Sequence, residues 1–514
     1  MKRPLWNLIT GTVTRYVLLF VNIAIGIFLM PFTMHHLGKP QYGLWMLVTS
    51  LTGYLQLLDL GYGNGLVRQV TQADARGDDE GMNAALSTFL FVYLGIGAVA
   101  FGAVVILASF ALPRFPNLSP DEVRTARLVL LIVGARAAIA FPMSVFGSIT
   151  TARQRFALTG SIAIVVALVQ GAATYLLLRA GYGLVPLVSV TTLLAIASYG
   201  AYIAAAILTF PGLRLSPRRF SVGQAREVTS FSLYLFLISL AIQFGYNIDN
   251  VIIAAFAGTS AVAVYAIAFR LADYQRQLCN QFNGLLFPVV VRFSAADEVD
   301  SLRATLVDGT RIAFGLITGV TLCLVTFADR LVAVWMGPGF ADSLPALYVL
   351  AAAGTVLVAA GPLGNLLLAR GRHRVVAFSC LGEAVLNLVL SIWLVRRYGI
   401  VGAAVGTAVS VTISNVLVQM PAACRLLDMP IGAFLRRISA PALIALAPGV
   451  AAAWLLRTTA SPSTFVEIVI AGAIVGLVYV AAFIGLGLDR IDRLRYFGRM
   501  RRVNPQPVAP GVAS

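Results

Sequence analysis

Apolar stretches of about 20 residues recur along the whole chain and are separated by short polar connections. A helix of about 20 apolar residues can cross the roughly 30 Å hydrocarbon core of a bilayer. The pattern predicts fourteen such helices. Their approximate centres are Val21, Thr52, Gly97, Arg136, Leu168, Ala195, Ala241, Gln275, Ile317, Val356, Leu386, Ser410, Leu446 and Gly476. We therefore expect an all-α integral membrane protein with no catalytic domain outside the membrane.

Composition and charge support this topology. The 514 residues are 59% hydrophobic and 11% charged, a balance that soluble domains do not have. With the N-terminus in the cytoplasm, the cytoplasmic segments carry 25 Lys and Arg residues, whereas the opposite connections carry 9. This positive-inside bias predicts that both termini are cytoplasmic. Because the net charge of +17 follows the topology, we expect the lipid bilayer as the partner and no nucleic acid.

Three pairs of segments indicate an internal duplication. Residues 38–45 resemble residues 258–265, residues 152–155 (ARQR) resemble 369–372 (ARGR), and residues 182–185 (YGLV) resemble 398–401 (YGIV). The pairs are 220, 217 and 216 positions apart and occur in the same order. Each copy contains about six transmembrane helices, so the chain crosses the membrane an even number of times between equivalent positions. The copies should therefore have the same orientation, as parallel transporter repeats do.

The duplication predicts two six-helix bundles followed by two additional C-terminal helices. We expect an N-terminal bundle at residues 1–212, a C-terminal bundle at 213–427, two extra transmembrane helices at 428–488, and a basic cytoplasmic tail at 489–514.

Four arginines lie inside the predicted spans: Arg15, Arg136, Arg270 and Arg276. A charge in the bilayer core costs roughly 3 kcal/mol or more unless it faces a partner or a water-filled cavity. These arginines are therefore candidates for binding an anionic substrate. Arg136 is the deepest, and its alternative role is a structural ion pair. Arg15 lies nearer its span end and could instead reach the headgroups.

The eighth span also contains Asp273, three residues from both Arg270 and Arg276. This spacing places neighbouring members of the set close together on one helix. Substrate contact and a self-satisfied structural triad both remain open. The surplus of one positive charge is what an anion would meet.

Buried acidic residues are candidates for ion coupling. Asp249 is the best candidate for a coupling-ion carboxylate, and the alternative for its polar stretch is hydrogen bonding between helices. Asp59 and Glu383 are further candidates, and each could instead pair with an arginine. Gln170 and Asn387 occupy matching repeat positions and are interpreted as packing residues.

Motifs for nucleotide binding, metal binding and catalysis are missing from the sequence. Only Lys2 and Lys39 are lysines, and neither lies in a phosphate-binding loop. The four cysteines and three histidines have no metal-ligand spacing, and no loop presents a catalytic set. We therefore expect no cofactor, no metal site and no enzyme activity.

Several motifs resemble bacterial polysaccharide flippases of the Wzx type. The opening signature comprises residues 37–45 (LGKPQYGLW), residues 58–63 (LDLGYG) and Arg68. The second half repeats it with residues 247–249 (NID) and 258–265, and later motifs are 369–372, Asn387 and 398–404 (YGIVGAA). The likeness extends over roughly residues 5 to 425.

This resemblance places the chain in the multidrug/oligosaccharidyl-lipid/polysaccharide flippase superfamily. It implies two six-helix bundles around a central cavity and a multi-pass protein of the bacterial inner membrane. The implied activity is the flipping of a polyprenyl-diphosphate-linked oligosaccharide from the cytoplasmic to the periplasmic leaflet during cell-surface polysaccharide biosynthesis. Cavity arginines would attract the diphosphate. A gradient of H+ or Na+ would drive alternating access, and a polysaccharide polymerase with its chain-length machinery would be partners.

Three other functions remain open at this point. A multidrug or cation antiporter of the same superfamily would favour carboxylates and aromatic rings in its cavity. A flippase for lipid-linked peptidoglycan precursors would share the chemistry proposed above. An intramembrane glycan ligase or polymerase would need a sizeable outer loop for catalysis.

Overall fold

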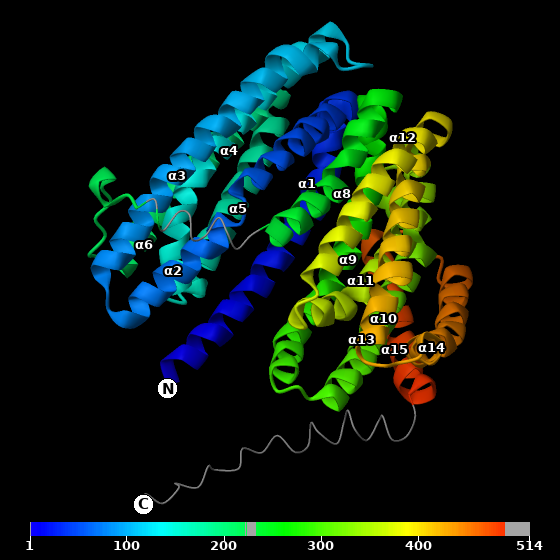
Figure 1. The fold of residues 1–514 in the computed structure, drawn as a ribbon. Coiled ribbons are helices and arrows are strands. Elements are labelled where there is room, and N and C mark those ends of the chain that lie inside the picture. Colours follow the sequence, from blue (N-terminus) through cyan, green and yellow to red (C-terminus); the bar gives the residue numbers. More distant parts are fainter. Residues whose placement is uncertain (1, 222, 224–232, 489–514) are drawn as a thin grey trace, which may run out of the picture. The chain divides into compact units, whose positions relative to one another are not determined.

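The computed structural model describes residues 2–221, 223 and 233–488, and in these residues every regular element is a helix (Figure 1). The main helices are α1 (Lys2–Gly53), α2 (Tyr62–Arg76), α3 (Asp79–Ile106), α4 (Pro120–Ala152), α5 (Phe156–Arg179), α6 (Leu184–Thr209), α8 (Leu233–Ala257), α9 (Thr259–Ala295), α10 (Val299–Trp335), α11 (Leu344–Ala369), α12 (His373–Thr412), α13 (Met420–Leu426), α14 (Ile431–Thr459) and α15 (Phe465–Ala482). Short 3-10 or π segments extend several of them, among them η1 (Tyr54–Asp59), η6 (Ile413–Gln419) and η7 (Phe483–Gly487).

The described helices account for the predicted number of membrane crossings. Ten helical segments are long and apolar enough to span a bilayer, and α8 is an eleventh. Two of the ten, which contain α1 and α12, are divided by a glycine with non-helical backbone, so each holds two crossings. The remaining crossing is α9, which has 37 residues but carries charges in its middle. The prediction of fourteen transmembrane helices is confirmed.

The glycines that divide these helices have a physical reason to be glycine. Gly38 in α1 has φ 76°, and Gly399 in α12 has φ 56°. Both values lie in the left-handed region, where a residue with a Cβ is strained. Gly258, which matches Gly38 in the second copy, has φ 81° in the turn between α8 and α9. The first pair of matching segments therefore encodes the same turn twice.

The second pair of matching segments also forms equivalent turns. Gln154 and Gly371 both have positive φ, 55° and 71°, and lie in the middle of the connections after α4 and α11. In each turn the preceding residue, Arg153 or Arg370, forms a salt bridge with an aspartate, at 2.9 and 2.7 Å respectively. The turn and its ion pair occur in both copies.

A contact between neighbouring helices is repeated as well. The Gln170 side chain on α5 donates to the carbonyl of Thr191 on α6 at 3.3 Å. In the second copy, the Thr407 hydroxyl donates to Asn387 Oδ1, also at 3.3 Å. The partners in these pairs are 217 and 216 positions apart. These contacts confirm the parallel duplication.

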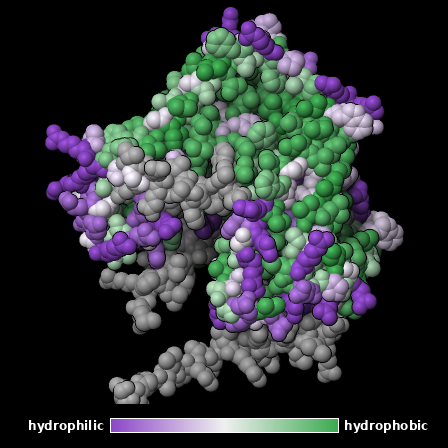
Figure 2. All heavy atoms as spheres, in the orientation of Figure 1, coloured by the Kyte–Doolittle hydropathy of each residue, from purple (hydrophilic) through white to green (hydrophobic). Residues whose placement is uncertain are grey.

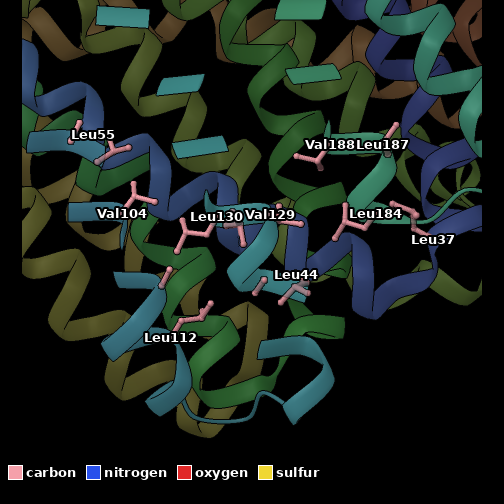
Figure 3. Packing of buried hydrophobic residues seen from close by; sticks show 14 of the residues in the cluster. Leu37, Leu44, Leu55, Val104, Leu112, Val129, Leu130, Leu184, Leu187 and Val188 are labelled. Atoms are coloured by element: carbon pink, nitrogen blue, oxygen red, sulfur yellow. The ribbon is translucent and has the colours of Figure 1, made fainter. Parts of the chain in front are cut away.

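Helices α1, α3, α4 and α6 share an apolar core in the N-terminal part of the chain (Figure 3). Leu44, Val104, Leu130 and Leu187 come from these four helices, and each is at most 1% exposed. Association of helices within a bilayer relies on close packing, because lipid is as apolar as the side chains. Gly97 illustrates this, since a Cβ there would lie 2.5 Å from the Ala138 carbonyl oxygen.

Helices α10, α14 and α15 pack together in the C-terminal part of the chain. The ring of Tyr479 on α15 lies over Gly319 on α10, where an added Cβ would come within 2.7 Å of the ring. Gly449 on α14 faces the same tyrosine at 3.4 Å. Small residues therefore allow three helices to meet at one aromatic ring.

The chain divides into two compact units. The first contains residues 1–274, 345–350 and 372–414, and the second contains 275–344, 351–371 and 415–514. The boundaries predicted at residues 212 and 427 follow the repeat instead, and they stay a prediction. The predicted tail at 489–514 lies outside the described residues. On the face drawn in Figure 2, hydrophobic residues cover the sides of the helices and hydrophilic residues gather near their ends, as a bilayer requires.

Candidate substrate and ion sites

Asp249 forms the centre of a buried polar cluster in the first unit. Its side chain on α8 is 3% exposed. Oδ2 accepts hydrogen bonds from the Tyr265 hydroxyl at 2.7 Å and from the Thr407 hydroxyl at 2.8 Å. On Oδ1, the distances to the Asn387 amide and the Ser391 hydroxyl are both 3.4 Å. Four side chains from two other helices therefore surround one carboxylate.

The cluster depends on how α12 folds back at Gly399. Asn387 and Ser391 precede this break and Thr407 follows it, so both segments of α12 reach Asp249. Asn387 Oδ1 in turn accepts from Ser391 at 3.0 Å. Gly406 makes room for the group, since a Cβ there would lie 2.6 Å from Ser391 Oγ. The result is a compact set of oxygen atoms in the middle of apolar helices.

This arrangement has a clear electrostatic consequence. A carboxylate inside a membrane protein needs a cation, a proton or strong hydrogen bonds, because burial of an uncompensated charge is costly. The four neighbours of Asp249 are neutral, and they contribute amide and hydroxyl oxygens. Hard monovalent cations and protons are the species that such an oxygen-lined site can accept.

Polar residues on both sides of Asp249 join α8 to α1 and η1 within the same unit. Gln243 donates to the Gly53 carbonyl at 2.9 Å and to Gln56 Oε1 at 3.1 Å. Asn250 donates to the Ser50 hydroxyl at 2.9 Å. These contacts are the hydrogen bonds between helices that the sequence left open as the alternative for this polar stretch, and a coupling role for Asp249 stays a prediction.

Arg136 lies at the midpoint of α4, as predicted, and its side chain is exposed. It forms a hydrogen bond with the hydroxyl of Tyr199 on α6. In the described part of the chain no acidic side chain forms a salt bridge with it, so the alternative of a structural ion pair has no support there. A guanidinium held by one neutral hydroxyl keeps donors available for an anion.

The charged residues of α9 differ in their surroundings. Arg270 lies over the ring of Tyr274, with the guanidinium carbon 5.9 Å from the ring centroid. Asp273 and Arg276 are buried, at 7% and 8% exposed. In the second unit, Gly354 on α11 gives Arg276 space, since a Cβ there would come 3.2 Å from Arg276 Cγ. Pairing within the predicted triad stays a prediction.

The other candidates lie apart from these groups. Arg15 is an exposed side chain in the first half of α1. Asp59 accepts hydrogen bonds from the Tyr93 hydroxyl at 2.6 Å and from the Gly63 amide at 3.4 Å. Glu383 forms a hydrogen bond with Ser414. The Tyr93 and Gly63 partners of Asp59 are uncharged, and pairing of either acid with an arginine, which the sequence left open, stays a prediction.

Sequence reasoning missed several members of these sites. Tyr199, Ser391 and Thr407 are hydroxyl residues in apolar stretches with no motif around them, and Tyr265 was noted only as the end of the repeated segment 258–265. Asn387 was assigned to packing alone, whereas the structure places it beside Asp249. Its spacing of 20 residues from Thr407, close to the 21 between Gln170 and Thr191, was the available signal.

Comparison with known proteins decides the family. Residues 8–294 match the sequence model of the family described as polysaccharide biosynthesis protein. The chain belongs to this family. A similar curated protein is the uncharacterized membrane protein EpsK of Bacillus subtilis, which is 22% identical over 409 residues, 77% of this chain and 79% of EpsK. Another is the probable low-salt glycan biosynthesis flippase Agl15 of Haloferax volcanii, 26% identical over 202 residues, 39% of this chain and 43% of Agl15.

A solved structure shares the fold of this family member. The lipid II flippase MurJ, in an inward closed conformation, aligns with a TM-score of 0.69 and 14% identity. The alignment covers 91% of this chain and 98% of MurJ. At this identity the likeness shows the fold alone. The chain is thus a multi-pass membrane protein with the helical fold seen in MurJ.

Proposed function

We propose that this protein flips a polyprenyl-diphosphate-linked oligosaccharide from the cytoplasmic to the periplasmic leaflet of a bacterial inner membrane. Membership of the polysaccharide biosynthesis family supports a role in cell-surface glycan assembly. The name of Agl15 supports flipping as the activity. No covalent bond is made or broken, so the chain acts as a transporter and needs no catalytic group.

The observation that carries this proposal is the set of arginines inside apolar helices, above all Arg136. It sits at the centre of α4 with a neutral partner. Guanidinium groups bind phosphate oxygens in pairs, which suits a diphosphate. Arg270 and Arg276 on α9 would provide further contacts, and Arg15 would meet the headgroup near the cytoplasmic surface.

Asp249 is proposed as the site that couples transport to an ion gradient. Its carboxylate would bind Na+ or H+ in one state and release it in the other. Asn387, Ser391 and Thr407 would supply additional oxygens, since all three contact either Asp249 or one another. Asp59 and Glu383 would stabilise helix packing through their hydrogen bonds to Tyr93 and Ser414.

The proposed transport cycle uses the duplication. The two bundles, at residues 1–212 and 213–427, would rock against each other while the lipid tail stays in the membrane. Both termini would lie in the cytoplasm, in agreement with the basic connections. A polysaccharide polymerase and its chain-length machinery would then act on the flipped glycan.

The test measures lipid-linked glycan in cells depleted of this protein and complemented with variants. Wild type should restore export, whereas Arg136→Ala should leave the diphosphate-linked oligosaccharide in the cytoplasmic leaflet. Arg124→Ala is the matched control, because Arg124 is also exposed and lies on α4 near its end. Normal glycan export in depleted cells, with altered sensitivity to drugs or cations, would contradict the proposal and favour the antiporter.

A further inference from the structure

A cavity of about 990 Å³ lies in the second unit, apart from all the residues discussed above. Its lining residues lie near the beginning of α10 and of α14 and at the end of η7 after α15. Its lining includes two arginines on α10, Arg303 and Arg311, and two consecutive arginines on α14, Arg436 and Arg437. The volume is at the upper end of pockets that hold a small ligand, about 300–1,000 Å³.

The charged wall of this cavity is positive, and hydrogen bonds and salt bridges hold part of it in place. Arg303 Nε donates to the Leu427 carbonyl at 2.7 Å, and Arg311 forms a salt bridge with Asp308 at 2.8 Å. These bonds hold the α10 guanidinium groups in place. Arg436 and Arg437 are exposed on the first turns of α14. Four arginines meet two lining carboxylates and Asp300, which pairs with Arg303 at 3.2 Å, so the cavity keeps a surplus of one positive charge.

The opposite wall is apolar and reaches the surface that faces lipid. Ile444 and Leu486 line the cavity and are 49% and 65% exposed. Pro441 and Gly487 close its base, where a Cβ on Gly487 would lie 2.6 Å from the Pro441 carbonyl oxygen. Charge at one end and exposed apolar side chains at the other match a molecule with a phosphate head and an aliphatic chain.

We propose that this cavity binds an anionic phospholipid, with its phosphate between the arginines of α10 and α14 and its chains along Ile444 and Leu486. The basic loops place this end of the unit on the cytoplasmic side, where anionic lipids attract clustered Arg residues. A polyprenyl diphosphate has the same phosphate and aliphatic chemistry. A bulk phospholipid fits better, because the cavity opens to the lipid through exposed apolar residues of the two extra helices.

The experiment is native mass spectrometry of the full-length protein with cardiolipin, phosphatidylglycerol or phosphatidylcholine. Wild type should retain the two anionic lipids and not phosphatidylcholine. Arg436→Gln/Arg437→Gln should weaken this retention about tenfold. Arg396→Gln/Arg397→Gln is the matched control, an exposed adjacent pair on α12 whose guanidinium groups lie over Phe256 and Trp393. It should bind as wild type does.

A second variant distinguishes the loss of lipid binding at this site from a folding defect. Ala440→Trp fills the cavity without a change of charge and should also reduce retention. Anionic lipid should raise the melting temperature of wild type and of the Arg396→Gln/Arg397→Gln control, but not that of the cavity variants. Equal retention by all variants would overturn the proposal. So would equal protection by inorganic diphosphate, which would indicate a free-anion site, or retention of polyprenyl diphosphate in place of phospholipid, which would assign the cavity to the transported substrate.

Discussion

The two copies of the repeat carry the same polar scaffold, but only the second has an acid at the position of Asp249. The second copy places Asn387, Ser391 and Thr407 around Asp249. Asp249 lies nine residues before Gly258. The equivalent residue of the first copy, nine residues before Gly38, is Leu29.

The scaffold itself is retained in the first copy. Gln170 and Thr191 match Asn387 and Thr407, and the buried Thr174 matches Ser391. Gln170 there bonds to a backbone carbonyl on the next helix. The comparison teaches that the amide and hydroxyl positions serve helix packing in both halves, and that a single acidic side chain converts one half into a candidate ion site.

The largest effect is expected at the acid itself. Asp249→Asn keeps the shape of the side chain, but it removes the charge and replaces one acceptor oxygen with an amide donor. We expect glycan export to fall about 100-fold, the upper part of the range for coupling between two sites. Export in complemented cells measures this. Thr174→Ala in the first copy is the control and should export normally. Wild-type export by Asp249→Asn would rule out the ion site.

The hydroxyl next to the acid should have the second largest effect. Thr407→Val is nearly isosteric and removes a donor that bonds to Asp249 at 2.8 Å. We expect the ion concentration for half-maximal transport to rise about tenfold, as for groups that support an ion ligand. The matched change is Thr191→Val, because the Thr191 hydroxyl donates to Leu187 of its own helix. Equal effects of both changes would show that the copies do not differ in ion binding.

A third prediction concerns stability. Gly406→Ala would bring a Cβ 2.6 Å from Ser391 Oγ and 3.3 Å from Asn387 Oδ1. We expect the free energy of unfolding to fall by about 1–3 kcal/mol, as overpacking does. Thermal unfolding in detergent measures the loss. Gly382→Ala on the same helix is the control, since an added Cβ there meets open space. A neutral Gly406→Ala would mean that the oxygen cluster is loosely packed.

The smallest effects are expected at the repeated turn. Arg370 pairs with Asp297, whose side chain is 78% exposed, so Arg370→Ala should cost less than about 1 kcal/mol. Arg153 has more partners: it bonds to Asp74 and the Thr209 carbonyl, and it lies over the Phe210 ring at 5.0 Å. Arg153→Ala should therefore lower the melting temperature more. The reverse order would contradict this assignment.

The sequence predicted the fold well because apolar length decides which segments enter a membrane. Fourteen spans and the duplication follow from that length and from glycines that must take positive φ. The limits of the two compact units could not be predicted from the sequence, because α8 and α12 pack mainly with each other and both belong to the first unit.

The candidate sites were only partly accessible from the sequence. Arg136 and Asp249 are visible because a charge in an apolar span is rare. Their partners are Tyr, Ser and Thr, which are common in transmembrane helices and become informative only when two helices bring them together. The arginine-lined cavity combines residues 303–311 with 428–444, and no local pattern marks it.

The central claim is that this family member moves a diphosphate-linked glycan by using the acid in its second copy. Purified wild type and Asp249→Asn should be placed in liposomes with a lipid-linked oligosaccharide and an imposed Na+ or H+ gradient. We expect wild type to move the glycan lipid to the other leaflet faster when a gradient is present. The variant should show no response to the gradient. Equal, gradient-dependent flipping by both proteins, or no flipping by wild type, would contradict it.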